Sequence, residues 1–300
     1  MLNFNTSEDQ IIEYKSQKKI YIFNTNDENS DKITIESFGE EWSKFSSFNS
    51  DEITNIGNEY FDIVDFKDFD SDAKVLDLGC GTGRWSIYLA SKFNEVYSLD
   101  PSDAIFSAAE LTSEFKNIYL IKASSENIPF DDNTFDFAIS LGVLHHIPDT
   151  EQALNTLVRK IKKGGKCLIY LYYSLDNRGF MYKLVFKFSN IFRFVISKLP
   201  ARVKSIVCDI IAFTVYIPLI GISKSTSMFI SKNLGSKLPL SYYSDKSLNV
   251  IRNDSLDRFG TPLEQRFSKL KIKEMMEKSG LYNITFSENK PYWHAIGQKK

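Results

Sequence analysis

The sequence is poor in cysteine, and its three copies, Cys80, Cys167 and Cys208, lack paired spacing. This pattern supports neither a disulfide framework nor a zinc site, so we expect reduced thiols in a cytoplasmic protein and no metal site. A bilayer span needs about 20 apolar residues. The most apolar stretch, 210–222, has 13 residues and contains Pro218, so a transmembrane helix is not expected. The N-terminus also lacks the charged-then-apolar layout of a secretory signal.

Acidic residues are nearly absent from residues 180–240, which hold nine Lys or Arg and one acid, Asp209. The formal charge of the whole chain is -1, so the rest of the chain carries about -9. Apolar residues recur at helical spacing through 180–199, with Lys183 and Lys187 on the opposite side. This pattern predicts a basic amphipathic helix, and we expect a second helix from Ala201 to about Ile217.

Strand and helix patterns alternate from Ala73 onward. The expected strands are 74–78, 95–99, 118–122, 135–141 and 166–172, and the expected helices between them are 84–93, 102–115 and 150–162, the last stopped by Gly164 and Gly165. Ser268 is expected to cap a further helix, and strands at 281–287 and 292–298 complete the pattern. The alternation predicts an α/β fold, a doubly wound, mostly parallel seven-stranded sheet with helices on both faces.

These patterns also predict the domain organisation. Residues 1–72 form an N-terminal extension whose capping helices, at 38–48 and 53–66, are expected to cover the open face of the sheet domain. The sheet domain consists of 73–175 and 261–300. Residues 176–260 form a helical insert that follows the fifth strand.

The stretch VLDLGCGTGRW, residues 75–85, places three glycines directly behind a buried strand. Gly79, Gly81 and Gly83 permit a turn tight enough for a ligand to approach the backbone, and Asp100 ends the next strand, where a carboxylate meets ribose hydroxyls. A dinucleotide fingerprint requires glycine where Arg84 stands, which disfavours a pyrophosphate and an NADH site. Two interpretations remain: a nucleotide-like ligand without phosphate, or glycines that serve helix packing alone.

Five motifs decide between them by their order and spacing. They are VLDLGCGTGRW, YSLDPS (97–102), ASSENIPFDDNTFDFAIS (123–140), LGVLHHIPDT (141–150) and IKKGGKCLIY (161–170). Together they resemble the class I S-adenosylmethionine (SAM)-dependent methyltransferases, most of all the methyltransferase type 11 group, over about residues 73–175. The resemblance implies a Rossmann-like methyltransferase fold, SAM as cofactor and an enzyme that methylates a small-molecule or lipid-like acceptor.

The resemblance also implies a set of site residues. Those expected to bind the cofactor are Asp77, Gly79, Cys80, Gly81, Gly83, Asp100, Pro101, Ser124, Ser125, Glu126 and Leu141. Family members often have Asp where Ser124 stands, so a serine oxygen or a backbone carbonyl is expected to meet the adenine amino group. His145 and His146 are the catalytic candidates, as a general base or as packing residues of the loop, and His294 is expected to be structural.

The basic insert is expected to close over the acceptor, because ligands of doubly wound sheets bind at the carboxyl ends of the strands. Three accounts of its composition stay open: apolar faces packed inward with lysines in water, membrane-surface contact through 180–222, or nucleic-acid binding. Without a base-stacking motif, we expect no nucleic-acid partner. The protein is then cytoplasmic, with contact at the inner face of the membrane as the alternative. A non-catalytic SAM-binding module is the alternative to the enzyme.

Overall fold

The protein divides into two compact units, which we call the sheet unit and the helical unit. The computed structural model describes residues 3–14, 18–23, 27–44, 50–176 and 179–300. The sheet unit contains Met1–Asp176 and Leu263–Lys300, and the helical unit contains Asn177–Pro262. The expected N-terminal extension therefore belongs to the same unit as the sheet.

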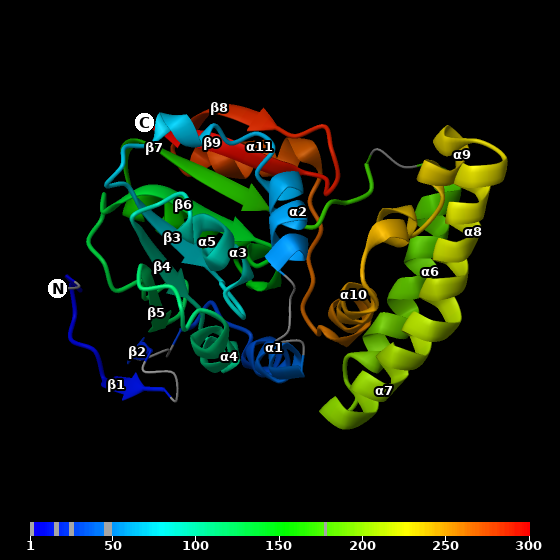
Figure 1. The fold of residues 1–300 in the computed structure, drawn as a ribbon, viewed down its shortest axis with the longest axis horizontal. Coiled ribbons are helices and arrows are strands. Elements are labelled where there is room, and N and C mark those ends of the chain that lie inside the picture. Colours follow the sequence, from blue (N-terminus) through cyan, green and yellow to red (C-terminus); the bar gives the residue numbers. More distant parts are fainter. Residues whose placement is uncertain (1–2, 15–17, 24–26, 45–49, 177–178) are drawn as a thin grey trace. The chain divides into compact units, whose positions relative to one another are not determined.

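The described residues of the sheet unit form nine strands in the order β1-β2-β5-β4-β3-β6-β7-β9-β8 (Figure 1). The strands are β1 (Gln10–Glu13), β2 (Lys19–Ile22), β3 (Lys74–Leu78), β4 (Glu95–Leu99), β5 (Ile118–Lys122), β6 (Phe135–Leu141), β7 (Ile161–Tyr170), β8 (Leu281–Phe286) and β9 (His294–Lys299). Pairing is parallel from β2 to β7, and β1, β8 and β9 pair antiparallel. The predicted doubly wound sheet is confirmed for β3 to β9, whereas β1 and β2 extend it by two strands that were not predicted.

The helices of the sheet unit pack against the sheet and against one another. The helices of the sheet unit are α1 (Lys32–Lys44), α2 (Ser50–Tyr60), α3 (Arg84–Ala90), α4 (Ala104–Leu111), α5 (Thr150–Lys160) and α11 (Lys269–Lys278), with short turns η1 (Phe66–Asp68) and η2 (Leu144–His146). α1 contacts α4, α2 contacts α3, and α11 packs on α5. Part of the predicted helix 38–48 lies outside the described residues. Ser268 caps α11 as expected, by accepting a hydrogen bond from the Lys271 amide.

The prediction that Gly164 and Gly165 stop a helix is wrong. α5 ends at Lys160, and β7 begins at the next residue, Ile161. Gly164 has φ 80°, and a Cβ at Gly165 would lie 2.7 Å from the Asp136 carbonyl oxygen. The two glycines thus let the chain continue as a strand close to β6, where the register shifts.

The helical unit contains α6 (Phe180–Ile196), α7 (Ala201–Ile211), the π-helical segment η3 (Ala212–Tyr216), α8 (Ile217–Phe229), α9 (Lys232–Lys237), the 3-10 helix η4 (Ser241–Asp245) and α10 (Leu248–Gly260). The expected end of the second helix at Ile217 is wrong, because Pro218 stands in the first turn of α8, where its ring and missing N–H are tolerated. The described residues thus include one continuous 28-residue helix, Arg202–Phe229, long and apolar enough to cross a membrane by length and composition.

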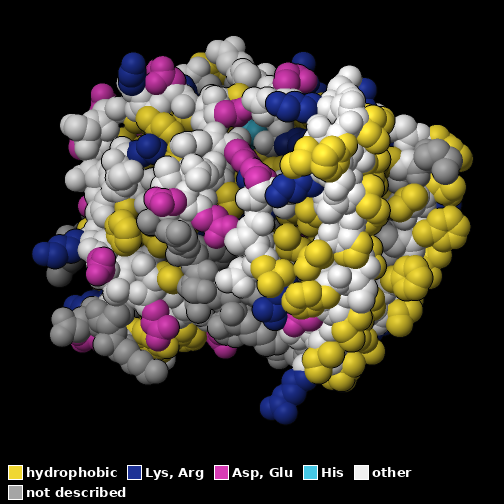
Figure 2. Space-filling model, turned by 45° about the vertical axis from the view of Figure 1, so that its right-hand side comes forward, with side chains coloured by type: hydrophobic (Ala, Val, Ile, Leu, Met, Phe, Trp, Pro, Cys, Tyr) yellow, Lys and Arg dark blue, Asp and Glu magenta, His cyan; other side chains and the backbone are white. Residues whose placement is uncertain are grey.

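Of the three accounts of the insert, the one in which its apolar faces pack inward does not agree with the structure. Nineteen large apolar side chains of the described helical unit are exposed, against four in the larger sheet unit. The nineteen are Phe180, Val185, Phe188, Ile191, Phe192, Phe194, Val195, Val203, Ile206, Ile210, Phe213, Val215, Ile217, Ile222, Met228, Phe229, Ile230, Leu234 and Leu248. Figure 2 shows hydrophobic side chains along the visible face of these helices.

Candidate functional site

The glycine turn lies between β3 and α3. The amides of Gly79 and Cys80 both donate to the Leu99 carbonyl at the end of β4, at 2.7 and 3.1 Å. Gly79 has φ 79°, and a Cβ there would lie 2.4 Å from the methyl carbons of Val143. Glycine is therefore required for both its backbone conformation and the close approach of the loop that follows β6.

Asp77, in β3, is a buried carboxyl with one satisfied oxygen. Ser98 donates to the Ser86 hydroxyl at 2.7 Å, and Ser86 donates to Asp77 Oδ2 at 2.7 Å. Asp77 Oδ1 has no hydrogen-bond partner among the described residues. Burial raises the pKa of Asp77 to about 7; the nearby Asp100 adds to this effect, and the Ser86 hydrogen bond opposes it. A buried acceptor without a donor fits a cationic ligand group such as an ammonium.

Asp100 follows β4 and faces the same turn. Its Oδ2 accepts the Gly81 amide at 2.8 Å, and its Oδ1 accepts the Ser102 amide and hydroxyl at 2.9 and 2.6 Å. Burial raises its pKa, and these hydrogen bonds act in the opposite direction. A carboxylate has about four acceptor positions, so three contacts leave room for a ligand hydroxyl.

Three other predicted cofactor residues lie around this turn. Cys80 is buried, and burial together with the Asp100 and Asp77 charges raises the pKa of its thiol well above the usual value, so it does not suit a nucleophile. Pro101 follows Asp100 and is partly buried. Leu141, the buried last residue of β6, pairs with Tyr170 of β7.

The predicted adenine residues follow β5 and divide into two kinds. Ser124 and Ser125 are buried, and the Ser124 hydroxyl accepts from Asn127 at 3.3 Å. Glu126 instead faces the N-terminal segment and α5, with Gln152 donating to its carboxylate. A hydrogen bond shared with the Asp27 carboxyl, then burial, raises the pKa of Glu126 to about 7. Glu126 is therefore already engaged by protein groups, whereas the role expected of the two serines stays a prediction.

The two candidate histidines lie in η2 and differ in their hydrogen bonds. His146 Nδ1 is 2.6 Å from the Leu263 carbonyl, which only accepts, so Nδ1 carries the hydrogen and Nε2 holds the lone pair of the neutral ring. His145 Nδ1 accepts the Tyr172 amide at 3.4 Å, which leaves the hydrogen on Nε2. Burial, then His146 and Arg266, lowers the pKa of His145 well below its usual value. This geometry suits a proton acceptor at His146 and a neutral donor at His145.

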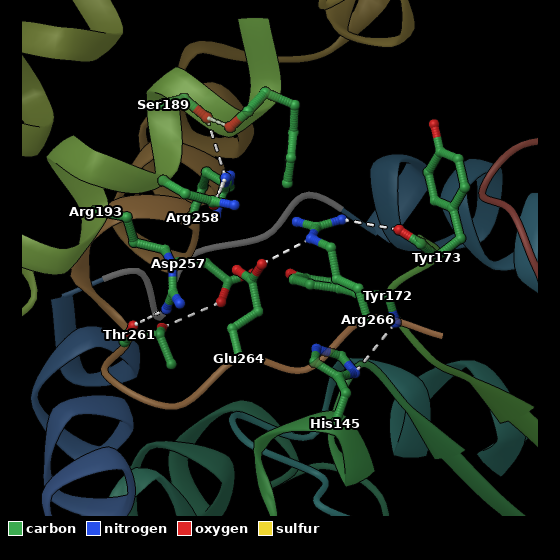
Figure 3. A network of polar contacts seen from close by, with 12 residues as sticks. His145, Tyr172, Tyr173, Ser189, Arg193, Asp257, Arg258, Thr261, Glu264 and Arg266 are labelled. Atoms are coloured by element: carbon green, nitrogen blue, oxygen red, sulfur yellow. Dashed lines mark hydrogen bonds and ion pairs between the residues drawn. The ribbon is translucent and has the colours of Figure 1, made fainter. Parts of the chain in front are cut away.

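Segment 263–267 returns to the sheet unit beside these histidines and holds a buried ion pair that the sequence analysis missed. Arg266 Nε donates to Glu264 at 2.7 Å, and Nη1 donates to the Tyr173 carbonyl at 3.3 Å (Figure 3). The guanidinium lies 5.0 Å from the Tyr172 ring centre, and His145 stacks on that ring at 3.9 Å. More than 90 residues separate Arg266 from the motif residues, so no local spacing reveals this cluster.

A second aromatic cluster surrounds Tyr60, the last residue of α2, and was also missed. Tyr60 contacts Trp85 at 4.8 Å, Tyr170 at 5.2 Å and His294 at 6.2 Å between ring centres. His294 Nε2 is 2.7 Å from Asp62, and Nδ1 is 2.8 Å from the Pro291 carbonyl. Both ring nitrogens of His294 are therefore committed to structural contacts. The described residues contain no group of three or more His, Cys, Asp or Glu that could hold a metal.

A glycine turn after the first parallel strand of the sheet, with a carboxylate after the second, is the arrangement expected of a class I SAM-dependent methyltransferase domain. Residues 76–169 match the family described as "Methyltransferase domain". The match confirms the predicted methyltransferase domain and SAM as its cofactor.

The chain is similar to curated proteins over that domain. A demethylmenaquinone methyltransferase from Bacillus mycoides (strain KBAB4) is 36% identical over 103 residues, or 32% of this chain and 43% of that protein. Its counterpart from Staphylococcus haemolyticus (strain JCSC1435) is 36% identical over 123 residues, or 39% and 51% of the two chains. The chain thus spans about half the length of these relatives.

Among solved structures, one similar chain is phosphoethanolamine N-methyltransferase 2 of Haemonchus contortus, in complex with phosphomonomethylethanolamine and S-adenosylhomocysteine. The alignment covers 78% of this chain and 38% of that chain, with 17% identity and a TM-score of 0.45.

Proposed function

We propose that the protein transfers a methyl group from SAM to an apolar, lipid-like acceptor of the quinone class. The observation that carries the proposal is the glycine turn with two buried carboxyls, Asp77 and Asp100, inside the segment that matches the methyltransferase domain. The acceptor class is supported by the relatives named for demethylmenaquinone.

In this proposal, different residues at the turn bind different parts of the cofactor. SAM supplies a methyl group on a sulfonium, which is already activated for displacement. Asp77 Oδ1 receives the methionine ammonium, and the free lone pairs of Asp100 receive the ribose hydroxyls. The bare backbone of Gly79 and Gly81 lets the methionine portion lie close to the turn.

Methyl transfer depends mainly on positioning the acceptor and, for a hydroxyl, on removing one proton. His146 is the base in this proposal, because the Leu263 carbonyl fixes the tautomer with the lone pair on Nε2. His145 is a hydrogen-bond donor to the acceptor, because its Nε2–H has no hydrogen-bond partner among the described residues. Their different tautomers favour different roles for the two residues.

We also propose that the reaction takes place in the cytoplasm. Support comes from the thiols of Cys80, Cys167 and Cys208, which are buried and free. Accumulation of these cysteines in mixed disulfides during normal growth would contradict this location.

Incubation with SAM labelled in its methyl group tests the activity. The full chain is supplied separately with the lipid and the aqueous extract of cells, and we expect label in an apolar product of the lipid pool. Asp100→Ala serves as the control that lacks the ribose contact. Label in the aqueous pool alone would reject the lipid-like acceptor, and SAM binding without any labelled product would favour the non-catalytic module.

Replacing His146 by Asn tests the base. Removal of a general base lowers the rate by about 10² to 10⁴. We expect kcat to fall while SAM affinity stays unchanged, and His145→Asn to act mainly on the KM of the acceptor. An unchanged kcat in His146→Asn would assign the residue to packing.

A further inference from the structure

The helical unit places polar contacts inside and apolar side chains outside. Arg252 donates through Nε and Nη2 to the two oxygens of Asp209, both at 2.8 Å, which joins α10 to α7. Ser255 donates to the Cys208 carbonyl at 2.7 Å. In Figure 3, Arg258 of α10 meets Ser189 of α6, with a distance of 3.1 Å. The described helices of this unit are thus held together partly by polar groups.

The outer face of these helices is apolar over a long distance. Within α7, η3 and α8, exposed and buried positions form two opposite stripes. The exposed stripe is Val203, Ile206, Ile210, Phe213 and Ile217, and the buried stripe is Cys208, Ala212, Tyr216, Ile220 and Ser223. Only 17% of the apolar window in this helix is buried inside the structure. A water-soluble helix faces water with a polar side, whereas Thr214 is the one polar side chain among the exposed positions of the described stretch from Val203 to Ile222.

Charge indicates the kind of surface that covers this face. Seven exposed Lys and Arg lie before and after this stripe along the chain, in α6, at the junction of α6 and α7, in α8 and in α9: Lys183, Lys187, Lys198, Arg202, Lys224, Lys232 and Lys237. Residues 180–240 hold a single acid, Asp209, and Arg252 neutralises it. Apolar side chains bordered by cations complement an anionic lipid surface, with headgroups at the rim and acyl chains beneath.

We propose that the helical unit is inserted into one leaflet of an anionic phospholipid bilayer, with α6, α7 and α8 lying in the plane of the interface. Spanning is disfavoured by connectivity, because Asp176 and Leu263, which flank the unit, belong to the same sheet unit, and the chain must therefore cross an even number of times. α6 carries Lys183, Lys187 and Arg193 within 17 residues, so it does not suit a second crossing. An in-plane position keeps all cations among the headgroups.

Vesicle sedimentation of the full chain tests the insertion. The lipids are phosphatidylcholine alone and phosphatidylcholine with phosphatidylglycerol, at about 0.1 M and about 1 M salt, between which the Debye length falls from about 10 to 3 Å. We expect binding to the anionic vesicles, weakened but not abolished at high salt because acyl-chain contacts are not screened. Protein that stays in solution with anionic vesicles at low salt overturns the proposal.

Paired variants separate insertion from other causes. Ile206→Asn with Phe213→Asn should weaken vesicle binding at least tenfold. The matched control is Ile33→Asn with Leu270→Asn, which alters side chains exposed by 67% and 66% in the sheet unit and should leave binding unchanged. Equal binding by both double variants rejects the stripe as the lipid contact.

Light scattering without lipid tests the alternative that a second copy of the chain covers the exposed stripe. A dimer that Ile206→Asn with Phe213→Asn converts to a monomer, without vesicle binding by the unaltered chain, would assign the stripe to self-association. Sedimentation needs neither SAM nor an acceptor, so its failure leaves the proposed methyl transfer untouched.

Discussion

The two units bury polar groups in different ways. In the sheet unit, Asp77 is buried beside the glycine turn with one oxygen lacking a partner among the described residues. In the helical unit, partly buried Asp254 accepts from Tyr243, and Tyr216 adds a further hydrogen bond. Burial raises the pKa of both acids, to about 7 and about 6. The first carboxyl keeps one oxygen available to a ligand, whereas the second is hydrogen-bonded within its own unit.

The largest expected effect is that of a substitution in the glycine turn of the sheet unit. Gly79→Ala introduces a Cβ into Val143 and strains a backbone with φ 79°. We expect a loss of about 2–5 kcal/mol in unfolding free energy, from about 1–2 for the conformation and about 1–3 for overpacking, together with loss of SAM binding. Gly142→Ala is the control, because φ is 78° but nothing lies within 4 Å, so only the conformational part applies. Equal losses in chemical denaturation would show that the contact with Val143 is relaxed in solution.

A substitution at Asp100 tests whether the buried carboxyls beside the glycine turn bind the cofactor. Asp100→Ala removes the acceptor for the ribose hydroxyls and should weaken SAM binding by about 1.5–3 kcal/mol, the range for a hydrogen bond to a charged group. Calorimetric titration with SAM measures this loss. Asp103→Ala, a nearby carboxyl whose side chain is 72% exposed, is the control and should bind as the unaltered chain does. Unchanged affinity in Asp100→Ala would remove Asp100 from the cofactor site.

The raised pKa of Asp77 makes SAM binding depend on pH. The carboxylate form is the one that pairs with an ammonium, so affinity should rise about tenfold per pH unit up to about pH 7 and then level off. Without ligand the sign for stability is opposite. The folded carboxyl holds its proton up to about 7 and the unfolded one only to 3.8, so the Asp77 contribution falls as pH rises through that window.

Calorimetry across this range measures both effects, with Asp77→Asn and Asp254→Asn as the pair of variants. The slope of affinity against pH should disappear in Asp77→Asn and persist in Asp254→Asn, because Asp254 belongs to the helical unit and is satisfied by tyrosines. A slope that survives in Asp77→Asn would place the titrating group elsewhere.

The sequence predicted the part of the fold that is governed by short-range patterns. β3, β4, β5 and β6 begin and end where expected, because buried parallel strands have compact apolar runs between turn signals. β1 and β2 were missed because each has only four residues, too few to form a clear apolar run. The helix was expected to stop near Pro218. It continues through a π-helical segment before this proline, and residue spacing does not reveal such a segment.

In the candidate site, too, the sequence predicted the residues that are linked by short spacing and not the contacts made over long sequence distances. Asp77, Gly79 and Asp100 lie within 24 residues of each other, and their spacing carries the motif. Leu263 reaches His146 from more than 100 residues away and fixes its tautomer, and burial, together with Arg266 from a similar distance, lowers the pKa of His145, so both effects depend on contacts that only the fold creates. The direction of the apolar stripe was left open for another reason: helical periodicity identifies two faces but does not say which one packs.

The smallest expected effect concerns the exposed apolar side chains that follow that stripe in α8, and it compares two isoleucines of this helix. Ile222 is 56% exposed and Ile220 is 8% exposed, two positions apart on one helix. Ile222→Ala removes few packing contacts, so the opening free energy of α8 amides in hydrogen exchange should change by less than about 0.5 kcal/mol. Ile220→Ala leaves a cavity and should lower the same quantity by about 2–4 kcal/mol. If Ile222→Ala lowers the opening free energy as much as Ile220→Ala in lipid-free solution, another protein surface covers Ile222. If the cost of Ile222→Ala appears only when anionic vesicles are added, the packing partner of Ile222 is the bilayer itself.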